Sequence, residues 1–399
     1  MRQLHYIRDA RALAGLVERL AGTERIALDT EFMRERTYYA KLCLVQLATA
    51  DVLAVVDPLA VSDLGPLWDV VTGGPEIVLH AAGQDLEIIA GLSGGVPRRH
   101  FDTQVAAAFV GYGDSIGYSR LVDRVIGHTP GHSEAYTDWT RRPLSQDQID
   151  YALDDVRFLL EITEKLESKL REAGREAWVR EELTSIMDAV QPEAQPDDMW
   201  RKVRGARGLR GRKLAVLQEV AAWREREAQA RDIPRQRVVA DRVLAEIAKR
   251  APKEPAQVER LRGLHPREAK RSSKAILEAV RRGLDRPEAE VPDWGKTAPH
   301  VKDARVEMIA ALLDAVLRGV ADKMNLSSRL LANRRDLEAL ARYRLAGEED
   351  VPDLPVLSGW RRDSVGERLL QVLHGELAVA IDDHESLGPQ LQLKAVGGP

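Results

Sequence analysis

Residues 26–31 of this 399-residue chain read Ile-Ala-Leu-Asp-Thr-Glu, an apolar run that ends in two carboxylates two positions apart. Because side chains alternate between the two faces of a β-strand, Asp29 and Glu31 are predicted to point the same way. Two carboxylates held close together repel each other, and a divalent metal ion or a raised pKa on one of them relieves that repulsion. The pattern Asp-x-Glu also occurs by chance at the ends of strands, so this stretch alone does not establish a metal site.

Two further acidic residues and a tyrosine extend the pattern. Asp85 follows the short apolar run 77–79 at the start of a predicted helix. Asp155 lies in a second predicted helix, whose start at Ser145 has the spacing of a capping box. Tyr151 precedes Asp155 by four residues, so both side chains share one face of that helix. Three separate segments therefore offer carboxylates, and one of them also offers a tyrosine hydroxyl.

The order of these residues resembles the three exonuclease motifs of the DEDD superfamily, in its tyrosine-bearing branch. Within that branch, the chain resembles the ribonuclease D family. Any one motif is a weak signal, but four in the family's order over about 130 residues are rarely a coincidence. The strings that carry the resemblance are Leu28-Asp-Thr-Glu-Phe-Met-Arg-Glu-Arg-Thr-Tyr-Tyr39, Lys41-Leu-Cys-Leu-Val-Gln-Leu47, Thr137-Asp-Trp-Thr-Arg-Arg-Pro-Leu144 and the helix of Tyr151.

The resemblance implies an α/β ribonuclease H-like domain with a mixed central sheet flanked by helices, and a 3′–5′ exoribonuclease activity. It implies that Asp29, Glu31 and Asp155 ligate one Mg²⁺ or Mn²⁺ ion, and that Asp29 bridges to a second ion whose shell includes Asp85. Tyr151 would orient the attacking water. Carboxylate oxygens suit both metals, and two ions can activate a water and stabilise the leaving 3′ oxygen. The expected substrates are structured RNA precursors such as tRNA, and the expected products are 5′-mononucleotides.

Several neighbouring residues have both a structural and a functional interpretation. His80 is expected to be a buried hydrogen-bonding residue more often than a ligand. Asp154 competes with Asp155 as a metal ligand, but only Asp155 has the spacing of the motif. Phe32 and Met33 are candidates to stack on the terminal base of the RNA, and both are equally compatible with a place in the core.

Apolar runs predict that strands come first and helices later. Runs rich in Val, Leu and Ile that are bounded by turn or charged residues are typical of adjacent strands of one sheet. Such runs occupy residues 25–32, 42–48, 52–56 and 77–79. Helices are predicted at 8–21 and 64–71, and residues 84–190 are predicted to be mainly helical.

Proline-containing stretches divide the chain into units. Residues 191–198 contain two prolines and no apolar periodicity, which indicates a linker, and prolines between residues 285 and 300 interrupt any helical pattern. An internal echo, in which Arg237-Val-Val-Ala240 matches Arg329-Leu-Leu-Ala332, predicts two related all-α bundles. The predicted units are an exonuclease domain at 1–195, a segment resembling the helicase and RNase D C-terminal (HRDC) domain at 205–285, a second, diverged HRDC-like bundle at 301–382, and a disordered tail at 383–399.

Basic charge is concentrated in one segment of the chain. Residues 1–200 carry 20 Lys and Arg against 33 Asp and Glu, residues 201–250 carry 15 against 6, and the remaining residues carry 24 of each. An RNA polyanion would be attracted to residues 201–250, although a solvated helix face is an alternative interpretation. The candidate RNA contacts in this segment are Arg201, Lys202, Arg204, Arg207, Arg210, Arg212 and Lys213.

Composition narrows the class of protein further. Cys43 is the one cysteine, so an internal disulfide is excluded, and the sequence has no run of eighteen apolar residues. Because residues 1–5 contain no apolar run, we expect no export signal. We therefore expect a cytoplasmic protein without a membrane span, and a monomer because one chain holds both the site and the basic segment. A DNA exonuclease would share the metal motifs, and an RNA-binding protein with an inactive site is the alternative that is not an enzyme. The presence of all four carboxylates and the tyrosine argues against an inactive site.

Overall fold

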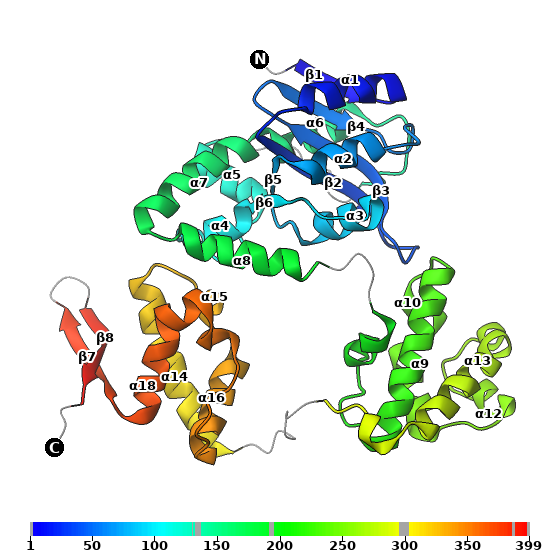
Figure 1. The fold of residues 1–399 in the computed structure, drawn as a ribbon, viewed down its shortest axis with the longest axis vertical. Coiled ribbons are helices and arrows are strands. Elements are labelled where there is room, and N and C mark those ends of the chain that lie inside the picture. The colour runs from blue at the N-terminus through cyan, green and yellow to red at the C-terminus, as the bar shows by residue number, and fades with distance from the viewer. Residues whose placement is uncertain are drawn as a thin grey trace.

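The computed structural model describes residues 3–129, 131, 137–190, 195–294, 303–384 and 388–396. Three bodies follow one another along the chain (Figure 1). The first contains a six-stranded sheet and eight helices among the described residues, and the other two are helical bundles. The expected architecture, an α/β domain with a mixed sheet followed by two helical bundles, is thereby confirmed.

The central sheet is mixed and has the strand order β1-β4-β3-β2-β5-β6. Its strand β2 lies in the middle, antiparallel to β3 and parallel to β5. The apolar runs predicted as strands form β2 to β5, because their Val, Leu and Ile side chains are buried on both faces of the sheet. The strands are β1 (Gln3–Ile7), β2 (Arg25–Met33), β3 (Lys41–Ala48), β4 (Val52–Val56), β5 (Glu76–Leu79) and β6 (Arg99–Asp102).

Two of these strands were not among the predicted elements. The sequence predicted no strand at residues 3–7, and residues 99–102 fell within the stretch predicted to be mainly helical. Both strands lie at the edges of the sheet, where β1 pairs with β4 and β6 pairs with β5. Strands of four and five residues are too short to show a clear alternation, so pairing with a neighbour decides their conformation.

Helices cover both faces of the sheet. One core cluster joins the sheet to α1 (Ala10–Leu20), α2 (Gly65–Gly73) and α3 (Gly83–Ser93). The other face packs against α4 (Thr103–Phe109), α5 (Tyr118–Ile126), α6 (Gln146–Arg157) and α7 (Leu159–Ala173), and α8 (Glu176–Asp188) follows. The predicted capping box is present at the start of α6, where the Ser145 side chain accepts from the backbone N–H of Gln148 and the Gln148 side chain accepts from that of Ser145.

The second body, which contains the segment that resembles an HRDC domain in sequence, has its own hydrophobic core. Helix α13 packs so closely on α9 that a Cβ atom at Gly283 would lie 2.5 Å from the Cα atom of Val216. Tyr38, from the loop between β2 and β3, is buried within this core. The elements of this body are η1 (Pro196–Lys202), α9 (Gly211–Ala230), α10 (Arg235–Val238), α11 (Asp241–Arg250), α12 (Pro255–Glu259), α13 (Pro266–Asp285) and η2 (Glu288–Glu290).

The third body repeats the helix order of the second. Helices α14 (Ala304–Lys323), α15 (Ser328–Leu331) and α16 (Arg334–Ala346) each begin 93 residues after α9, α10 and α11. Their helix starts therefore agree with the internal echo in the sequence. The remaining elements are η3 (Pro355–Leu357), α17 (Gly359–Arg361), η4 (Arg362–Gly366), α18 (Glu367–His374), β7 (Leu377–His384) and β8 (Gly388–Ala395).

The prediction of a disordered tail at 383–399 is wrong for most of the described residues in that range. Strands β7 and β8 form an antiparallel hairpin whose register runs from Leu377 opposite Ala395 to His384 opposite Gly388. Val379 and Leu393 pack against the core shared by the third body and the exonuclease domain. This contact with helices stabilises a terminal segment that the sequence analysis predicted to be disordered.

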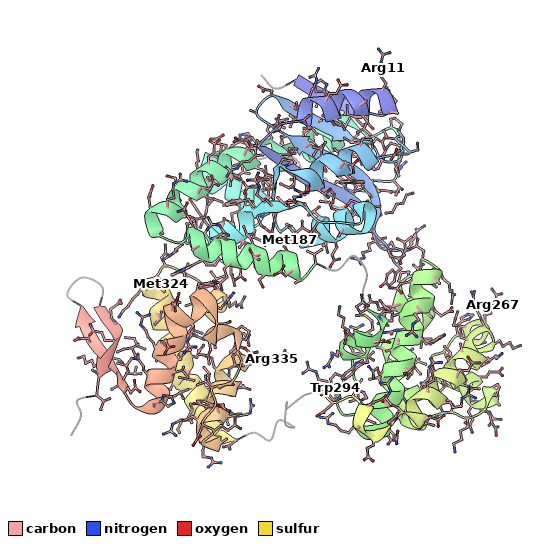
Figure 2. All side chains as sticks on the ribbon, in the orientation of Figure 1. Arg11, Met187, Arg267, Trp294, Met324 and Arg335 are labelled. Carbon is pink, nitrogen blue, oxygen red and sulfur yellow. The ribbon has the colours of Figure 1, made fainter. Side chains whose placement is uncertain are left out.

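The third body is joined to the exonuclease domain at α8. Trp178 and Trp360 stack with ring centroids 5.3 Å apart. Arg175, just before α8, donates to the carbonyl oxygen of Phe109 at 2.6 Å and to that of Met324 at 2.6 Å, and Figure 2 marks Met324 at this junction. Among the residues that the structure describes, every helix is too short or too polar to cross a bilayer.

Candidate active site

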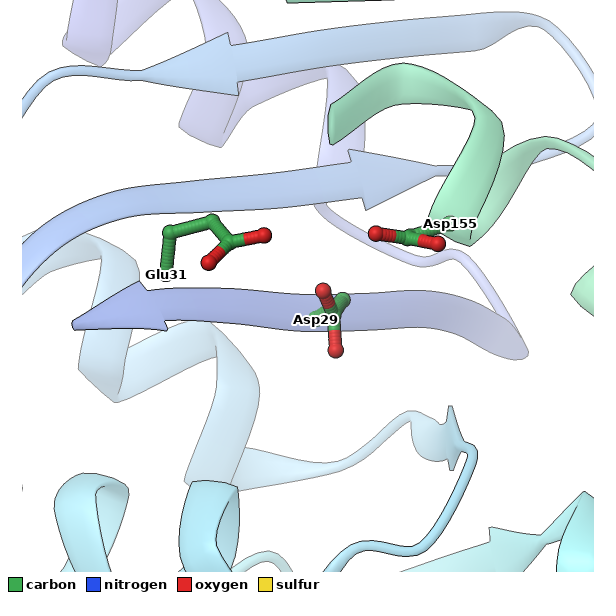
Figure 3. Close-up of side chains that lie close together, drawn as sticks. All are labelled: Asp29, Glu31 and Asp155. Atoms are coloured by element: carbon green, nitrogen blue, oxygen red, sulfur yellow. The ribbon is translucent and has the colours of Figure 1, made fainter. Parts of the chain in front are cut away.

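Strand β2 presents two carboxylates on the face of the sheet that α6 covers. Asp29 and Glu31 point the same way, as the alternation of a strand requires. Oxygens of Asp29, Glu31 and Asp155 all lie within 4.8 Å of one another (Figure 3). The structure thus brings together three of the predicted carboxylates, two from β2 and one from a helix far along the chain.

Helix α6 carries Asp155, the third member of the group, and also Tyr151. Tyr151 lies one turn before Asp155, and the charge of Asp155 acts on the Tyr151 hydroxyl group. The ring of Tyr151 packs against that of Trp139, with centroids 6.1 Å apart. The predicted shared face of this helix is confirmed, because Tyr151 and Asp155 both turn toward the strand that carries the acids.

Asp85 occupies a neighbouring position, outside the group within 4.8 Å. It lies in the first turn of α3, and its carboxylate accepts a hydrogen bond from the Thr30 hydroxyl. Its charge still acts on the carboxyls of both Asp29 and Glu31. Asp85 thus lies beside the group of three, its role as a ligand of a second ion stays a prediction, and Thr30 orients its carboxylate, a role that spacing alone did not indicate.

The electrostatics of the site reflect burial and crowding. Burial, followed by repulsion from Asp155 and Asp85, raises the pKa of Glu31 to about 8. Burial raises the pKa of Asp155 to about 7 and that of Asp85 to about 6. Burial and the three neighbouring carboxylates raise the pKa of Asp29 well above its ordinary value. Such a cluster is stabilised either by protons or by a cation of high charge.

The donor set fits a hard divalent cation. Carboxylate oxygens are the ligands that Mg²⁺ and Mn²⁺ accept, and Mg²⁺ usually keeps several waters. Gln46 lies directly opposite Asp29 on β3 and is fully buried, yet neither polar atom of its side chain has a protein partner. An orphaned amide beside the acids is expected where ordered water belongs to the site.

The competing candidates have structural roles. His80 contacts the Thr103 hydroxyl through Nδ1 at 2.9 Å and the Ile116 carbonyl oxygen through Nε2 at 3.0 Å, which confirms a hydrogen-bonding residue. Asp154 forms an ion pair with Arg157 at 3.1 Å and lies outside the group of three. This arrangement favours Asp155 over Asp154 as the residue of the motif.

The candidate RNA contacts differ in their exposure and surroundings. Phe32 and Met33 are half-buried and pack against the cores on opposite faces of the sheet. The seven basic residues between 201 and 213 are all exposed. Some of them are already engaged, since Arg204 pairs with Asp241 at 3.3 Å and the Arg201 guanidinium lies 4.4 Å from the ring centre of Trp200.

A mixed sheet flanked by helices, with clustered carboxylates over its middle strand, defines the class of this protein. It is a DEDD-type 3′–5′ exonuclease that uses divalent metal. Two family descriptions agree with this class: residues 4–171 match the family described as 3′-5′ exonuclease, and residues 213–280 match the HRDC domain.

Similarity to known proteins extends over almost the whole chain. Ribonuclease D of Nitrobacter hamburgensis is 41% identical over 374 residues, which cover 93% of this chain and 95% of that protein. Ribonuclease D of Granulibacter bethesdensis is 38% identical, with 96% and 95% covered. The crystal structure of Escherichia coli RNase D, described as an exoribonuclease involved in structured RNA processing, has a TM-score of 0.81 at 32% identity and covers 94% of this chain and 99% of its own. The chain belongs to the ribonuclease D family, and it is a 3′–5′ exoribonuclease.

Proposed function

We propose that this enzyme trims the 3′ ends of structured RNA precursors, in particular tRNA precursors, using two divalent cations and releasing 5′-mononucleotides. The observation that carries the proposal is the group of Asp29, Glu31 and Asp155, whose oxygens lie within 4.8 Å of one another. The similarity to the Escherichia coli enzyme, which is described as acting in structured RNA processing, supports the class of substrate.

Each residue of the site has a proposed role. Asp29, Glu31 and Asp155 would hold one Mg²⁺ or Mn²⁺ ion, and Asp29 would bridge to a second ion together with Asp85. When bound, the ions supply the positive charge that activates a water and stabilises the leaving 3′ oxygen. The Tyr151 hydroxyl, on which the charges of Asp155, Glu31 and Asp29 act, would orient that water.

The RNA body would bind through the exposed basic residues between 201 and 213, and Phe32 and Met33 would contact the terminal base. Neutralising phosphates with lysine and arginine provides affinity without sequence preference. We also propose that the enzyme acts as a monomer in the cytoplasm, since one chain contains both the carboxylates and the basic segment.

The proposal is tested with a tRNA precursor labelled at its 3′ end and a DNA of matched sequence. The wild-type protein is expected to release mononucleotides from the RNA only when Mg²⁺ or Mn²⁺ is present. Replacing Asp29, Glu31, Asp85 or Asp155 one at a time by its amide is expected to reduce the rate by about 10³-fold, as for other groups that stabilise developing charge. Asp154→Asn is the matched control and is expected to be mild.

The direction of hydrolysis is tested with modified ends. A 3′-phosphate is expected to block the reaction, because the proposed pocket ends at a free 3′ hydroxyl, and changes at the 5′ end are expected to have no effect. Cleavage of a circular RNA, or equal rates on the DNA, would contradict the proposal. An amide variant that keeps the wild-type rate at saturating metal would remove that residue from the site.

A further inference from the structure

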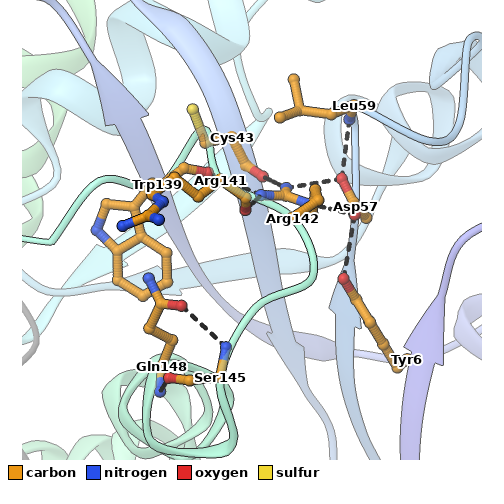
Figure 4. A network of polar contacts seen from close by, with 9 residues as sticks. All are labelled: Tyr6, Cys43, Asp57, Leu59, Trp139, Arg141, Arg142, Ser145 and Gln148. Atoms are coloured by element: carbon orange, nitrogen blue, oxygen red, sulfur yellow. Dashed lines mark hydrogen bonds and ion pairs between the residues drawn. The ribbon is translucent and has the colours of Figure 1, made fainter.

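The site is assembled from β2 and α6, which lie far apart in the chain, so something must hold the start of α6 in register with the sheet. The loop 137–145 leads into α6 and belongs to one of the strings that resemble ribonuclease D. Arg142 in this loop is tied to two strands of the sheet (Figure 4). Sequence reasoning assigned no role to Arg142 or to its partner Asp57.

Arg142 uses its whole guanidinium group. Nε donates to Asp57 Oδ2 at 2.6 Å, and one terminal nitrogen donates to Asp57 Oδ1 and to the Cys43 carbonyl oxygen, both at 2.7 Å. The other terminal nitrogen donates to the carbonyl oxygens of Trp139 at 2.8 Å and Arg141 at 2.7 Å. The planar fork of arginine suits several simultaneous acceptors, which a lysine ammonium does not reproduce.

Asp57 is a fixed anchor for this group. It directly follows β4 and is only 2% exposed, and it accepts further hydrogen bonds from the Tyr6 hydroxyl at 3.1 Å and the Leu59 backbone N–H at 3.0 Å. Burial alone would raise its pKa, but the hydrogen bond and charge of Arg142 together with the hydrogen bonds from Leu59 and Tyr6 outweigh burial, so the pKa of Asp57 lies below its ordinary value. The pair is therefore ionised at neutral pH and stays formed.

The contact between Arg142 and Cys43 lies next to β2, the strand that carries Asp29 and Glu31. Glu31 pairs with Leu44 and Phe32 pairs with Leu42, so Cys43 is the extra residue of a β-bulge opposite Glu31. Arg142 binds the carbonyl oxygen of this bulge residue. One side chain thereby links the loop before α6 to the part of β3 that faces the acids of β2.

The other end of the network reaches the tyrosine. Arg142 holds the backbone of Trp139, and the fully buried ring of Trp139 packs against Tyr151. A further hydrogen bond, from the Gln148 side chain to the Thr137 hydroxyl at 3.0 Å, ties the first turn of α6 to the same loop. A displacement of the loop would therefore shift the ring of Trp139, and the packing of this ring against Tyr151 would shift the Tyr151 hydroxyl.

We propose that Arg142 and Asp57 are positioning residues of the reaction: their ion pair locks the loop 137–145 to the β3 bulge and so sets Tyr151, through Trp139, relative to the acids of β2. The inference rests on the proposed function of Tyr151. Neither residue touches the reacting atoms, and each acts through the geometry of α6.

The first test is kinetic and uses the full chain. Arg142→Lys keeps a positive charge for Asp57 but cannot serve all five acceptor oxygens of the guanidinium. It is expected to lower kcat on a short RNA by about 10- to 100-fold, because small displacements of reacting groups cost this much, and to leave KM within about threefold. Arg25→Lys is the matched control, since Arg25 lies on the same strand as the acids, pairs with Glu76 at 2.7 Å and is similarly half-buried. A kcat for Arg142→Lys equal to that of the control would overturn the proposal.

The second test asks whether the effect passes through the tyrosine. In a Tyr151→Phe background, Arg142→Lys is expected to cost less than about threefold, because residues that act as one unit are not additive. An equal loss in both backgrounds would show that Arg142 acts elsewhere and would overturn the chain of contacts. If the single variant folds poorly, Asp57→Asn combined with Arg142→Gln removes both charges and leaves no buried carboxylate unpaired.

The third test does not depend on activity. The ¹⁹F resonance of 3-fluorotyrosine placed at position 151 is expected to shift in Arg142→Lys and Asp57→Asn and to stay unchanged in Arg25→Lys. An unchanged resonance in the first two variants would overturn the proposal. A wild-type protein without metal-dependent RNA hydrolysis would refute the proposed function instead, and the resonance would still report on the contact.

Discussion

Tyr151 lies between a packed ring and the acids of the site. Trp139 packs against its ring, and the charges of Asp155, Glu31 and Asp29 act on its hydroxyl group. Burial and the neighbouring acids raise the pKa of Tyr151 above its ordinary value, so the hydroxyl stays protonated at neutral pH. A protonated hydroxyl can donate one hydrogen bond and accept another, as the orientation of a water requires.

Tyr151→Phe is expected to slow the chemical step by about 10- to 1000-fold while metal and RNA affinities barely change, because it removes one positioned hydroxyl and no ligand. Single-turnover rates with a short RNA measure the step, and calorimetric titration with Mn²⁺ measures the metal affinity. A single-turnover rate equal to that of the parent would assign the tyrosine a purely structural role.

The raised pKa values make the effect of metal depend on pH. Glu31 and Asp155, with pKa values of about 8 and 7, keep protons in the folded state that the unfolded chain has lost above about pH 4. The metal-free protein therefore loses stability as the pH rises from about 4 to about 8. Near pH 8 most of these protons have left the carboxyls, so a divalent ion competes with fewer protons there.

We expect saturating Mg²⁺ to raise the melting temperature more at pH 8 than at pH 6. An ion present at 100 times its Kd contributes about 2.7 kcal/mol to folding. Differential scanning calorimetry with and without EDTA measures the difference, and Asp29→Asn is the control in which it should shrink. A shift of equal size at both pH values would show that the carboxyls of the cluster are ionised without metal.

The loop between β2 and β3, which follows the acids Asp29 and Glu31, contacts the HRDC bundle. The Tyr38 hydroxyl donates to Glu225 of α9, and the backbone N–H groups of Tyr38 and Tyr39 both donate to Asp232 at 3.0 Å. Glu225 is fully buried, and Arg235 pairs with it at 3.2 Å. A buried carboxylate that accepts a hydrogen bond from a hydroxyl of another domain indicates a specific contact between the two domains.

Tyr38→Phe is expected to loosen this contact by about 1 to 3 kcal/mol, because one oxygen of the buried Glu225 loses its hydroxyl donor. Hydrogen exchange of the amides in α9 and in residues 34–40 is expected to quicken accordingly. Exchange in α14, which belongs to the other bundle, serves as the internal control. Unchanged exchange in α9 would mean that the Tyr38 hydroxyl contributes nothing to the contact, which ring packing and the hydrogen bonds to Asp232 then hold.

The whole molecule combines an acidic catalytic domain with a basic segment at the start of the HRDC bundle. Residues 1–200 have an excess of 13 acidic groups, from 33 acidic and 20 basic residues, whereas residues 201–250 have an excess of 9 basic groups, from 15 and 6. All seven candidate basic residues are exposed. This separation of charge predicts that the body of a large RNA is bound mainly by the HRDC side while its 3′ end reaches the acids.

Replacing Lys202, Arg207 and Lys213 by glutamine is expected to weaken the binding of a tRNA-sized RNA and to reduce its dependence on salt. Each phosphate that the variant no longer neutralises lowers the slope of log K against log[salt] by about 0.7 to 0.9. The titration uses an Asp29→Asn background, so that no RNA is degraded.

The matched control replaces two exposed basic residues of the third body, Lys323 and Arg335, by glutamine. It is expected to leave both the affinity and the salt slope nearly unchanged, since residues 251–399 carry equal numbers of acidic and basic groups. Equal slopes for the two variants and the parent would show that the basic segment is only a solvated surface.

Local sequence determined much of the fold. Strands β2 to β5, the capping box of α6 and the repeated helix order of the two bundles follow from apolar runs, side-chain spacing and prolines. The same local rules placed Asp29 and Glu31 on one face of a strand, and Tyr151 and Asp155 on one face of a helix. The resemblance to ribonuclease D then indicated that these two faces meet.

Tertiary structure decided the rest. Strands β1 and β6 and the hairpin of β7 and β8 are stabilised by pairing and by contact with helices, so their own residues carry little signal. The contacts of Arg142 with Asp57 and of Tyr38 with Glu225 join residues 85 and 187 positions apart, and no spacing rule predicts such pairs. The sequence predicted the acids of the site because the spacing of Asp29 and Glu31, and that of Tyr151 and Asp155, is local. The residues that hold α6 against the sheet, Arg142 and Asp57, come together only in the folded protein.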